Sequence, residues 1–102
     1  MPTFAVRTIH GPGWDDQRSM RQQDAWAEHA SFMNALVDDG FVILGGPLGA
    51  DGNHTGALLI LEAASEDQLV ARLNADPWAR RDILAIGTVD TMTILLDHRG
   101  AG

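Results

Sequence analysis

The hydrophobic positions of this chain recur with two periods, which together predict four strands and two helices. Residues 3–9 alternate between apolar and polar side chains, as a strand with two different faces does. Short apolar runs bounded by turn residues predict the other strands, at 41–44, 55–62 and 84–96. The turn signal Asp51-Gly52-Asn53 predicts a hairpin between the second and third strands.

A long amphipathic helix is predicted over residues 19–40, and it carries a histidine within its apolar side. At about 100° per residue, His29 points in the same direction as the apolar side chains of this helix. These side chains are Trp26, Phe32, Met33, Leu36 and Val37. Ser19 and Gln22 have the spacing of a capping box, and Gly40 supplies a left-handed residue that ends the helix. The pattern therefore directs His29 toward the core.

A second, shorter helix is predicted to begin at Ser65, which repeats the capping-box spacing with Gln68. This helix must end before Pro77, because the residue that precedes a proline avoids helical torsions. The triplet Asp76-Pro77-Trp78 thus lies at the exit of the second helix. Residues 79–82 are expected to form a short turn before the last strand.

The predicted order of elements, β-α-β-β-α-β, is typical of a ferredoxin-like α+β fold. Such a fold has a four-stranded antiparallel sheet with both helices on one face. The other face stays uncovered, and because several strands are apolar on both faces, a homodimer formed through that face is expected. The 102 residues are expected to form one domain over 1–97, followed by a short tail at 98–102.

The formal net charge is −7, and the chain contains no lysine. Nucleic acids and anionic membrane surfaces attract clustered lysine and arginine, so neither is an expected partner. The absence of cysteine excludes disulfides, a thiol nucleophile and thiolate metal ligands. No leader and no membrane-spanning run is recognisable in the sequence, and a cytoplasmic location is therefore expected.

His29 and Asp76 are the candidates for catalysis. Asp76 is expected to approach the first helix on the same side of the sheet, and a carboxylate bonded to the imidazole would fix one tautomer for general base or acid chemistry. The alternatives are a core-edge histidine with a satisfied hydrogen bond and an ordinary turn aspartate. His10, His29, His54 and His98 lack metal-ligand spacing, so no metal site is predicted, and His54 beside the turn is expected to be exposed.

Further residues are expected to line a ligand pocket around this pair. Two glycines and a proline at the end of the second strand allow close approach of a ligand, although they can also form a plain turn. Tryptophans offer flat walls for a planar ring, with core packing as the alternative, and arginines offer a site for an anionic group, with surface solvation as the alternative. These residues are Gly45, Gly46, Pro47, Trp14, Trp26, Trp78, Arg7 and Arg21. No nucleotide-binding glycine motif occurs, and no cofactor is expected.

Three short motifs, in their order and spacing, resemble those of the YCII-related (YciI-like) proteins. They are residues 28–33, 44–48 and 76–78. The resemblance extends over residues 4–96 and implies a ferredoxin-like dimer related to the dimeric α/β-barrel proteins, with His29 and Asp76 in one pocket. The family includes a dehydrochlorinase of chlorinated hydroxyquinols, so the resemblance also implies an enzyme. This chain differs from shorter members by the segment HGPGWDDQ at 10–17 and by the tryptophan of its Asp-Pro-Trp triplet.

The leading hypothesis is a cofactor-independent enzyme in which His29, oriented by Asp76, moves a proton on a small aromatic or cyclic substrate during elimination or isomerisation. One alternative is a non-catalytic module that binds a small molecule in the same pocket. Another is an interaction domain without pocket chemistry, which a fully buried His29 far from Asp76 would favour.

Overall fold

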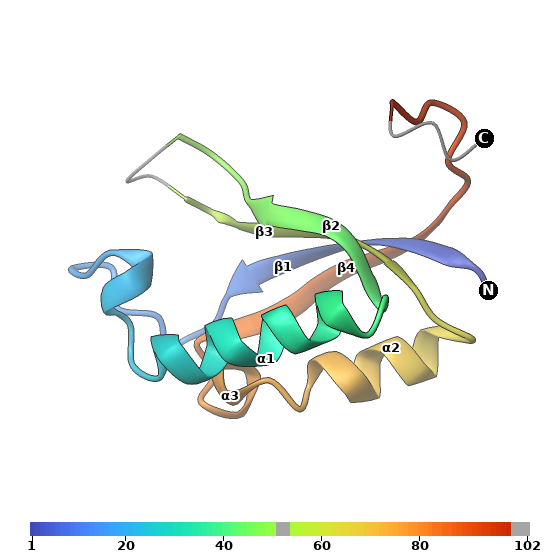
Figure 1. Ribbon diagram of the computed structural model, residues 1–102. Helices are drawn as coiled ribbons and strands as arrows, with labels where there is room; N and C mark the ends of the chain where they lie inside the picture. The colour runs from blue at the N-terminus through green and yellow to red at the C-terminus, as the bar shows by residue number, and fades with distance from the viewer. Residues whose placement is uncertain (51–53, 99–102) are drawn as a thin grey trace.

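The computed structural model describes residues 1–50 and 54–98, which form a four-stranded sheet with helices packed on it (Figure 1). The strands are β1 (Thr3–His10), β2 (Val42–Pro47), β3 (Gly56–Glu62) and β4 (Leu84–Met92). The helices are α1 (Trp26–Asp38), α2 (Glu66–Leu73) and α3 (Pro77–Arg80), together with a single 3-10 turn, η1 (Met20–Gln22). The turn expected at 51–53 lies outside the described residues.

The strand order across the sheet is β2-β3-β1-β4, and each neighbouring pair is antiparallel. The consecutive strands β2 and β3 pair directly, whereas the helical connections bring β1 between β3 and β4. Figure 1 shows the helices on one face of the sheet, and none of the described elements covers the other face. The predicted ferredoxin-like α+β architecture is therefore confirmed.

The alternation of side chains along β1 decides which residues enter the core. Phe4 and Val6 are 6% and 0% exposed beneath the helices, whereas Arg7 is exposed on the uncovered face. From the helices, Leu36 and Leu69 pack into the same cluster. Full burial of each such side chain stabilises the fold by roughly 1.5–3 kcal/mol. This core holds α1 and α2 against the sheet.

The first helix is shorter than the predicted range 19–40, because α1 begins only at Trp26. Ala25, just before it, has a left-handed backbone with φ 58°, which separates α1 from η1. Gln23 is 4% exposed, and its side chain bonds to the loop backbone instead of lying on a polar helix face. The predicted end is correct, since Gly40 follows the helix with φ 77°.

Both capping spacings occur at the beginning of a helical segment. The Ser65 hydroxyl accepts a hydrogen bond from the Gln68 N–H at 3.1 Å, and α2 begins directly after it, as predicted. The spacing at Ser19 instead begins the 3-10 turn η1, where the Ser19 N–H donates to Oε1 of Gln22 at 3.0 Å. A capping signature therefore marks where a helical segment begins but does not determine how long that segment is.

Two segments near the C-terminus differ from the prediction. The short helix α3 occupies part of the expected turn 79–82. β4 ends at Met92 rather than at Leu96, because Met92 already pairs with Thr3, the first residue of β1. No helix in the described part of the chain is long and apolar enough to span a bilayer.

β4 contains a β-bulge at Gly87. Thr8 pairs with Ile86 and Arg7 pairs with Thr88, so Gly87 is an extra residue without a partner in β1. The bulge divides β4 into a first half, Leu84–Ile86, that lines the cavity described below and a second half that begins at Thr88.

Candidate active site

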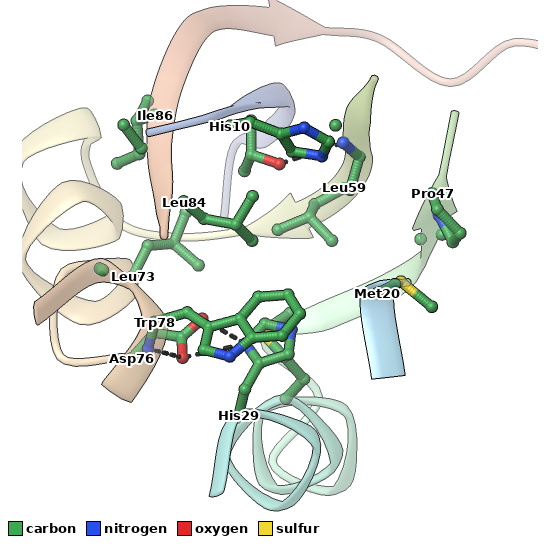
Figure 2. A pocket seen from close by; sticks show the side chains of 18 of the residues that line it. His10, Met20, His29, Pro47, Leu59, Leu73, Asp76, Trp78, Leu84 and Ile86 are labelled. Carbon is green, nitrogen blue, oxygen red and sulfur yellow. Dashed lines mark hydrogen bonds and ion pairs between the residues drawn. The ribbon is translucent and has the colours of Figure 1, made fainter. Parts of the chain in front are cut away.

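His29 on α1 and Asp76, just before α3, form a hydrogen-bonded pair (Figure 2). Nδ1 of His29 lies 2.7 Å from Oδ2 and 3.0 Å from Oδ1 of Asp76. The two side chains are 12% and 9% exposed, so the pair is largely shielded from water. The expected approach of Asp76 to the first helix is found. His29 is neither fully buried nor remote from Asp76, and the hypothesis of an interaction domain loses its support.

The triplet Asp76-Pro77-Trp78 fixes this carboxylate through local structure. Asp76 is the N-cap of α3, and its Oδ1 accepts a hydrogen bond from the Trp78 N–H at 2.9 Å. Pro77 occupies the first helical position, where a missing N–H leaves no hydrogen bond unmade. Because the cap engages mainly one oxygen, the other oxygen remains directed at His29.

The indole of Trp78 holds the imidazole from one side. It is 2% exposed and lies flat against His29, with ring centroids 3.8 Å apart and planes 5° apart. Its Nε1–H donates to the carbonyl oxygen of Asp24 at 2.7 Å, which anchors the indole itself. Trp26 packs nearby, with its ring centroid 5.6 Å from that of Trp78. The imidazole is thus fixed by one hydrogen-bonded edge and one stacked face.

The second ring nitrogen of His29, Nε2, is available to a ligand. Since Asp76 accepts at Nδ1, the neutral imidazole carries its proton there and presents a lone pair at Nε2. No protein group among the described residues bonds to Nε2. In the same part of the chain, no buried side-chain nitrogen or oxygen lacks a partner, so Nε2 must be accessible to solvent. Such an atom can accept a proton from a bound molecule.

A cavity of about 290 Å³ lies between α1 and the helix-covered face of the sheet, and His29 and Asp76 both line it. Aliphatic side chains from the sheet form much of its wall, and Figure 2 shows Leu59 and Leu84 among them. The expected pocket residues that line the cavity are Gly45, Gly46, Pro47, Trp14, Trp26 and Trp78. The volume is near the low end of the range typical of ligand pockets, roughly 300–1,000 Å³, so the cavity suits a small ligand.

The two arginines expected to hold an anionic group do not line this cavity. Arg7 follows Val6 and precedes Thr8 on β1, and because adjacent strand residues point to opposite faces, it lies exposed on the uncovered face. Arg21 in η1 lies outside the cavity, with its guanidinium carbon 5.9 Å from the centroid of the Trp26 ring. The expectation of an arginine-bound anion in this cavity is therefore not supported.

Two histidines that sequence reasoning did not place in the pocket line the cavity as well. His10 is the last residue of β1, one position beyond the predicted end of that strand, and it shares the phase of the inward-facing Thr8. The alternation of β1, extended by one residue, would have found it. His54 was expected to be exposed, but it is half-buried and lines the cavity. No sequence signal placed His54 there, because its position depends on the pairing of β2 with β3.

No cluster of three or more histidine, cysteine, aspartate or glutamate side chains in the described residues is arranged to hold a metal ion. The ionisable groups that line the cavity are the His29–Asp76 pair and two further histidines, His10 and His54.

The fold and the site define a ferredoxin-like α+β protein with a histidine–aspartate pair beside a small, largely apolar cavity. The chain belongs to the YCII-related domain family, because the model of that family matches residues 9–93. Among solved structures it is similar to the 5-chloro-2-hydroxyhydroquinone dehydrochlorinase TftG from Burkholderia phenoliruptrix AC1100, in complex with 2,5-dihydroxybenzoquinone. The two are 27% identical, with a TM-score of 0.68 over 89% of this chain and 93% of that chain. No curated protein matches the chain.

Proposed function

We propose that this protein is an enzyme that moves a proton on a small aromatic or cyclic substrate, during an elimination or an isomerisation, without a cofactor. The observation that carries the proposal is the geometry of His29. Its Nδ1 lies 2.7 Å from the Asp76 carboxylate, while Nε2 is open beside an apolar cavity. A positioned base of this kind accelerates proton transfer by about 10²–10⁴-fold.

In the proposed reaction, Nε2 of His29 removes a proton from the substrate. Asp76 keeps the Nδ1 proton in place and faces the positive charge of the imidazolium that forms. In an isomerisation the same proton returns to another substrate atom. In an elimination the electron pair of the broken bond to hydrogen, a C–H bond of a cyclic ketone or an O–H bond of a chlorinated phenol in its keto tautomer, moves into the ring as a new double bond. A leaving group such as chloride departs with its own electron pair, and the imidazolium releases its proton to water. Neither route requires an external oxidant or reductant.

The similarity to TftG supports the choice of a cyclic, oxygen-substituted substrate, because that protein is a dehydrochlorinase of a hydroxyhydroquinone. For this chain, 5-chloro-2-hydroxyhydroquinone is therefore the first substrate to test and 2,5-dihydroxybenzoquinone the first ligand. The stacked indole of Trp78 and the neighbouring ring of Trp26 provide flat surfaces beside His29.

The test measures chloride release from 5-chloro-2-hydroxyhydroquinone, and solvent deuterium uptake into a panel of cyclic ketones and phenols, under nitrogen. We expect His29→Ala to abolish turnover and Asp76→Asn to reduce it by about 10²–10⁴-fold, with both variants folded by circular dichroism. His98→Ala is the matched control, since His98 is exposed and lies outside the cavity. Full turnover in a folded His29→Ala protein would refute the proposed role.

The same experiment separates the enzyme from a non-catalytic binding module. If 2,5-dihydroxybenzoquinone binds in a His29-dependent manner and no compound of the panel is converted, the cavity holds a ligand without acting on it. Conversion of one compound, lost in His29→Ala but not in His98→Ala, establishes catalysis.

We also propose that the protein is a homodimer joined through the uncovered face of the sheet. Support comes from large apolar side chains that are exposed on the strands: Ile9 at 46%, Leu44 at 50% and Met92 at 38%. In the sheet register, Ile9 and Leu44 lie out of phase with the core side chains of their strands. We expect a dimer mass in sedimentation equilibrium and a monomer for Leu44→Lys. A monomer mass for the native chain at micromolar concentration contradicts the proposal.

A further inference from the structure

The cavity has a second polar end, away from the His29–Asp76 pair, and His10 forms it. The phase of β1 places His10 on the helix-covered side of the sheet, where it pairs with Leu84. Figure 2 shows Leu59 and Leu84 between His10 and Asp76, so the two polar ends lie apart across the apolar wall. His54 lines the cavity too, and it is near enough to His10 for its charge to influence that ring.

The His10 ring is held in place rather than free on the surface. It stacks on the indole of Trp14, with centroids 3.6 Å apart and planes 7° apart. Trp14 in turn meets the edge of Trp78 at 5.8 Å and 88°. The loop between His10 and Trp14 is fixed by backbone hydrogen bonds, since the N–H of Gly11 donates to the Ile83 carbonyl at 2.9 Å. Because the His10 ring is held by stacking and by the fixed loop, it is preorganised for a ligand.

Only glycine allows the loop to come this close to the segment after α3. A Cβ atom built on Gly11 would lie 2.2 Å from the carbonyl oxygen of Asp82, and one on Gly13 would lie 2.5 Å from that of Arg81. The Gly13 N–H also donates to the Asp82 carbonyl at 2.7 Å. The segment HGPGWDDQ therefore forms a fitted part of the cavity wall.

The ring nitrogens of His10 are available for hydrogen bonding. No protein group among the described residues bonds to them, and in that part of the chain no fully buried nitrogen lacks a partner, so they reach solvent-accessible space. Thr8, two residues earlier on β1, also lines the cavity, but its Oγ1 already accepts a bond from the Ala57 N–H at 3.1 Å, which leaves its O–H donor and one lone pair.

Burial lowers the pKa of His10 below its usual value, an effect that the charge of His54 increases and that of Asp16 opposes. A neutral imidazole has one donor and one acceptor nitrogen, which suits an uncharged hydroxyl or carbonyl group.

We propose that His10, supported by Trp14, is a specificity-determining residue that binds an oxygen substituent of the ligand at the end opposite His29. The ligand class is thus a planar ring with hydrogen-bonding oxygens at two opposite positions, one at each polar end of the cavity. This inference rests on the proposed function for the identity of the reacting end. The proposed role of His10 can be tested separately, because it concerns ligand binding and not turnover.

Binding of hydroquinone, 4-fluorophenol and 1,4-difluorobenzene tests the proposal, since fluorine is close to a hydroxyl in size but donates no hydrogen bond. Affinities are measured under nitrogen by calorimetry for the native protein, His10→Phe and the control His98→Phe. His10→Phe keeps a ring to stack on Trp14 and removes only the nitrogens. If that variant misfolds, His10→Asn replaces it, and we expect it to keep a partial preference.

We expect the native protein and His98→Phe to bind hydroquinone roughly threefold to tenfold more tightly than 4-fluorophenol, the effect of one neutral hydrogen bond. In His10→Phe the two phenols should bind equally, and both should exceed difluorobenzene because the His29 end persists. Equal binding of the two phenols to the native protein overturns the His10 inference, and so does a preference that survives in His10→Phe. In either case, turnover that depends on His29 leaves the proposed function intact. If none of the three rings binds, the aromatic substrate class fails together with the inference.

Discussion

The two polar ends of the cavity are built in different ways. At the His29 end, Asp76 supplies both the helix cap and the carboxylate, and Trp78 supplies the stacking ring; as whole residues the two are 6% and 2% exposed. At the His10 end, an irregular loop holds a half-buried His10 against a half-buried Trp14 by ring stacking and backbone contact.

This difference indicates that one end contributes mainly to global stability and the other mainly to ligand binding. The His29 end belongs to the packed part of the domain, so its geometry persists as long as the fold does. The His10 end is held by ring stacking and by backbone bonds between the loop and residues 82–83, outside the main hydrophobic cluster. Substitutions at the first end should therefore reduce global stability, whereas substitutions at the second should change ligand binding.

The largest effect is expected at Trp78. Trp78→Ala removes a fully buried indole and should lower the free energy of unfolding by about 3–5 kcal/mol. Trp14→Ala is the matched variant at the other end, and because Trp14 is half-buried its cost should be clearly smaller. Urea unfolding measures both values. Equal losses for the two tryptophans would remove the distinction between the ends.

A smaller effect is expected at Asp76. Asp76→Ala removes the cap of α3 and leaves Nδ1 of His29 without its partner, at a cost of about 1–3 kcal/mol. Asp76→Asn keeps an oxygen for the Trp78 N–H, and since asparagine caps helices as well as aspartate does, it should retain most of that stability. Thermal unfolding compares the two variants. An Asp76→Asn protein as unstable as Asp76→Ala would show that charge, rather than capping, dominates here.

A local effect is expected in the loop. Gly11→Ala forces the loop away from the Asp82 carbonyl, which should expose Trp14 and increase trypsin cleavage at Arg18 while the global stability falls by no more than about 1–3 kcal/mol. Gly46→Ala is the control, because a Cβ atom there meets nothing within 4 Å. Tryptophan emission and cleavage rates unchanged in Gly11→Ala would contradict the fitted loop.

The smallest effect is the pH dependence of His10. Since burial lowers its pKa in the native state below 6.5, the unfolded state binds a proton more readily. The stability contributed by neutral His10 is present above pH 6.5 and is lost as the pH falls toward the lower native pKa. Urea unfolding at pH 7.5 and 5.5 should therefore show a larger decrease for the native chain than for His10→Phe. A smaller decrease for the native chain than for His10→Phe would mean that the effect of Asp16 on the His10 pKa outweighs that of burial.

Much of the fold could be predicted because its signals are local. The strand alternation at Phe4 and Val6 and the capping residue Ser65 depend only on neighbouring residues, and both predictions hold. The start of α1 could not be predicted, because the left-handed Ala25 and the buried Gln23 are set by loop contacts. The apolar periodicity continues on both sides of Ala25, so the sequence pattern alone does not show that the helix is interrupted there.

The same argument applies to the site. His29 and Asp76 could be proposed because a helical phase and a proline-fixed helix exit locate them. Arg7 was assigned to the pocket by its chemistry alone, and strand alternation turns it to the other face. His54 is brought to the cavity by a strand pairing whose register no short motif encodes.

The extra residue at Gly87 has a consequence for how this scaffold can diversify. Ile86 and Val89 are an odd number of positions apart, yet both pack toward the helices because the bulge resets the alternation between them. If Gly87 instead paired with Thr8 in a regular ladder, Ile86 and Leu84 would turn outward and empty one wall of the cavity while Val89 kept its place. The strand therefore contains two independently adjustable halves, and a change in ligand size need not disturb the hydrophobic centre that keeps the domain folded.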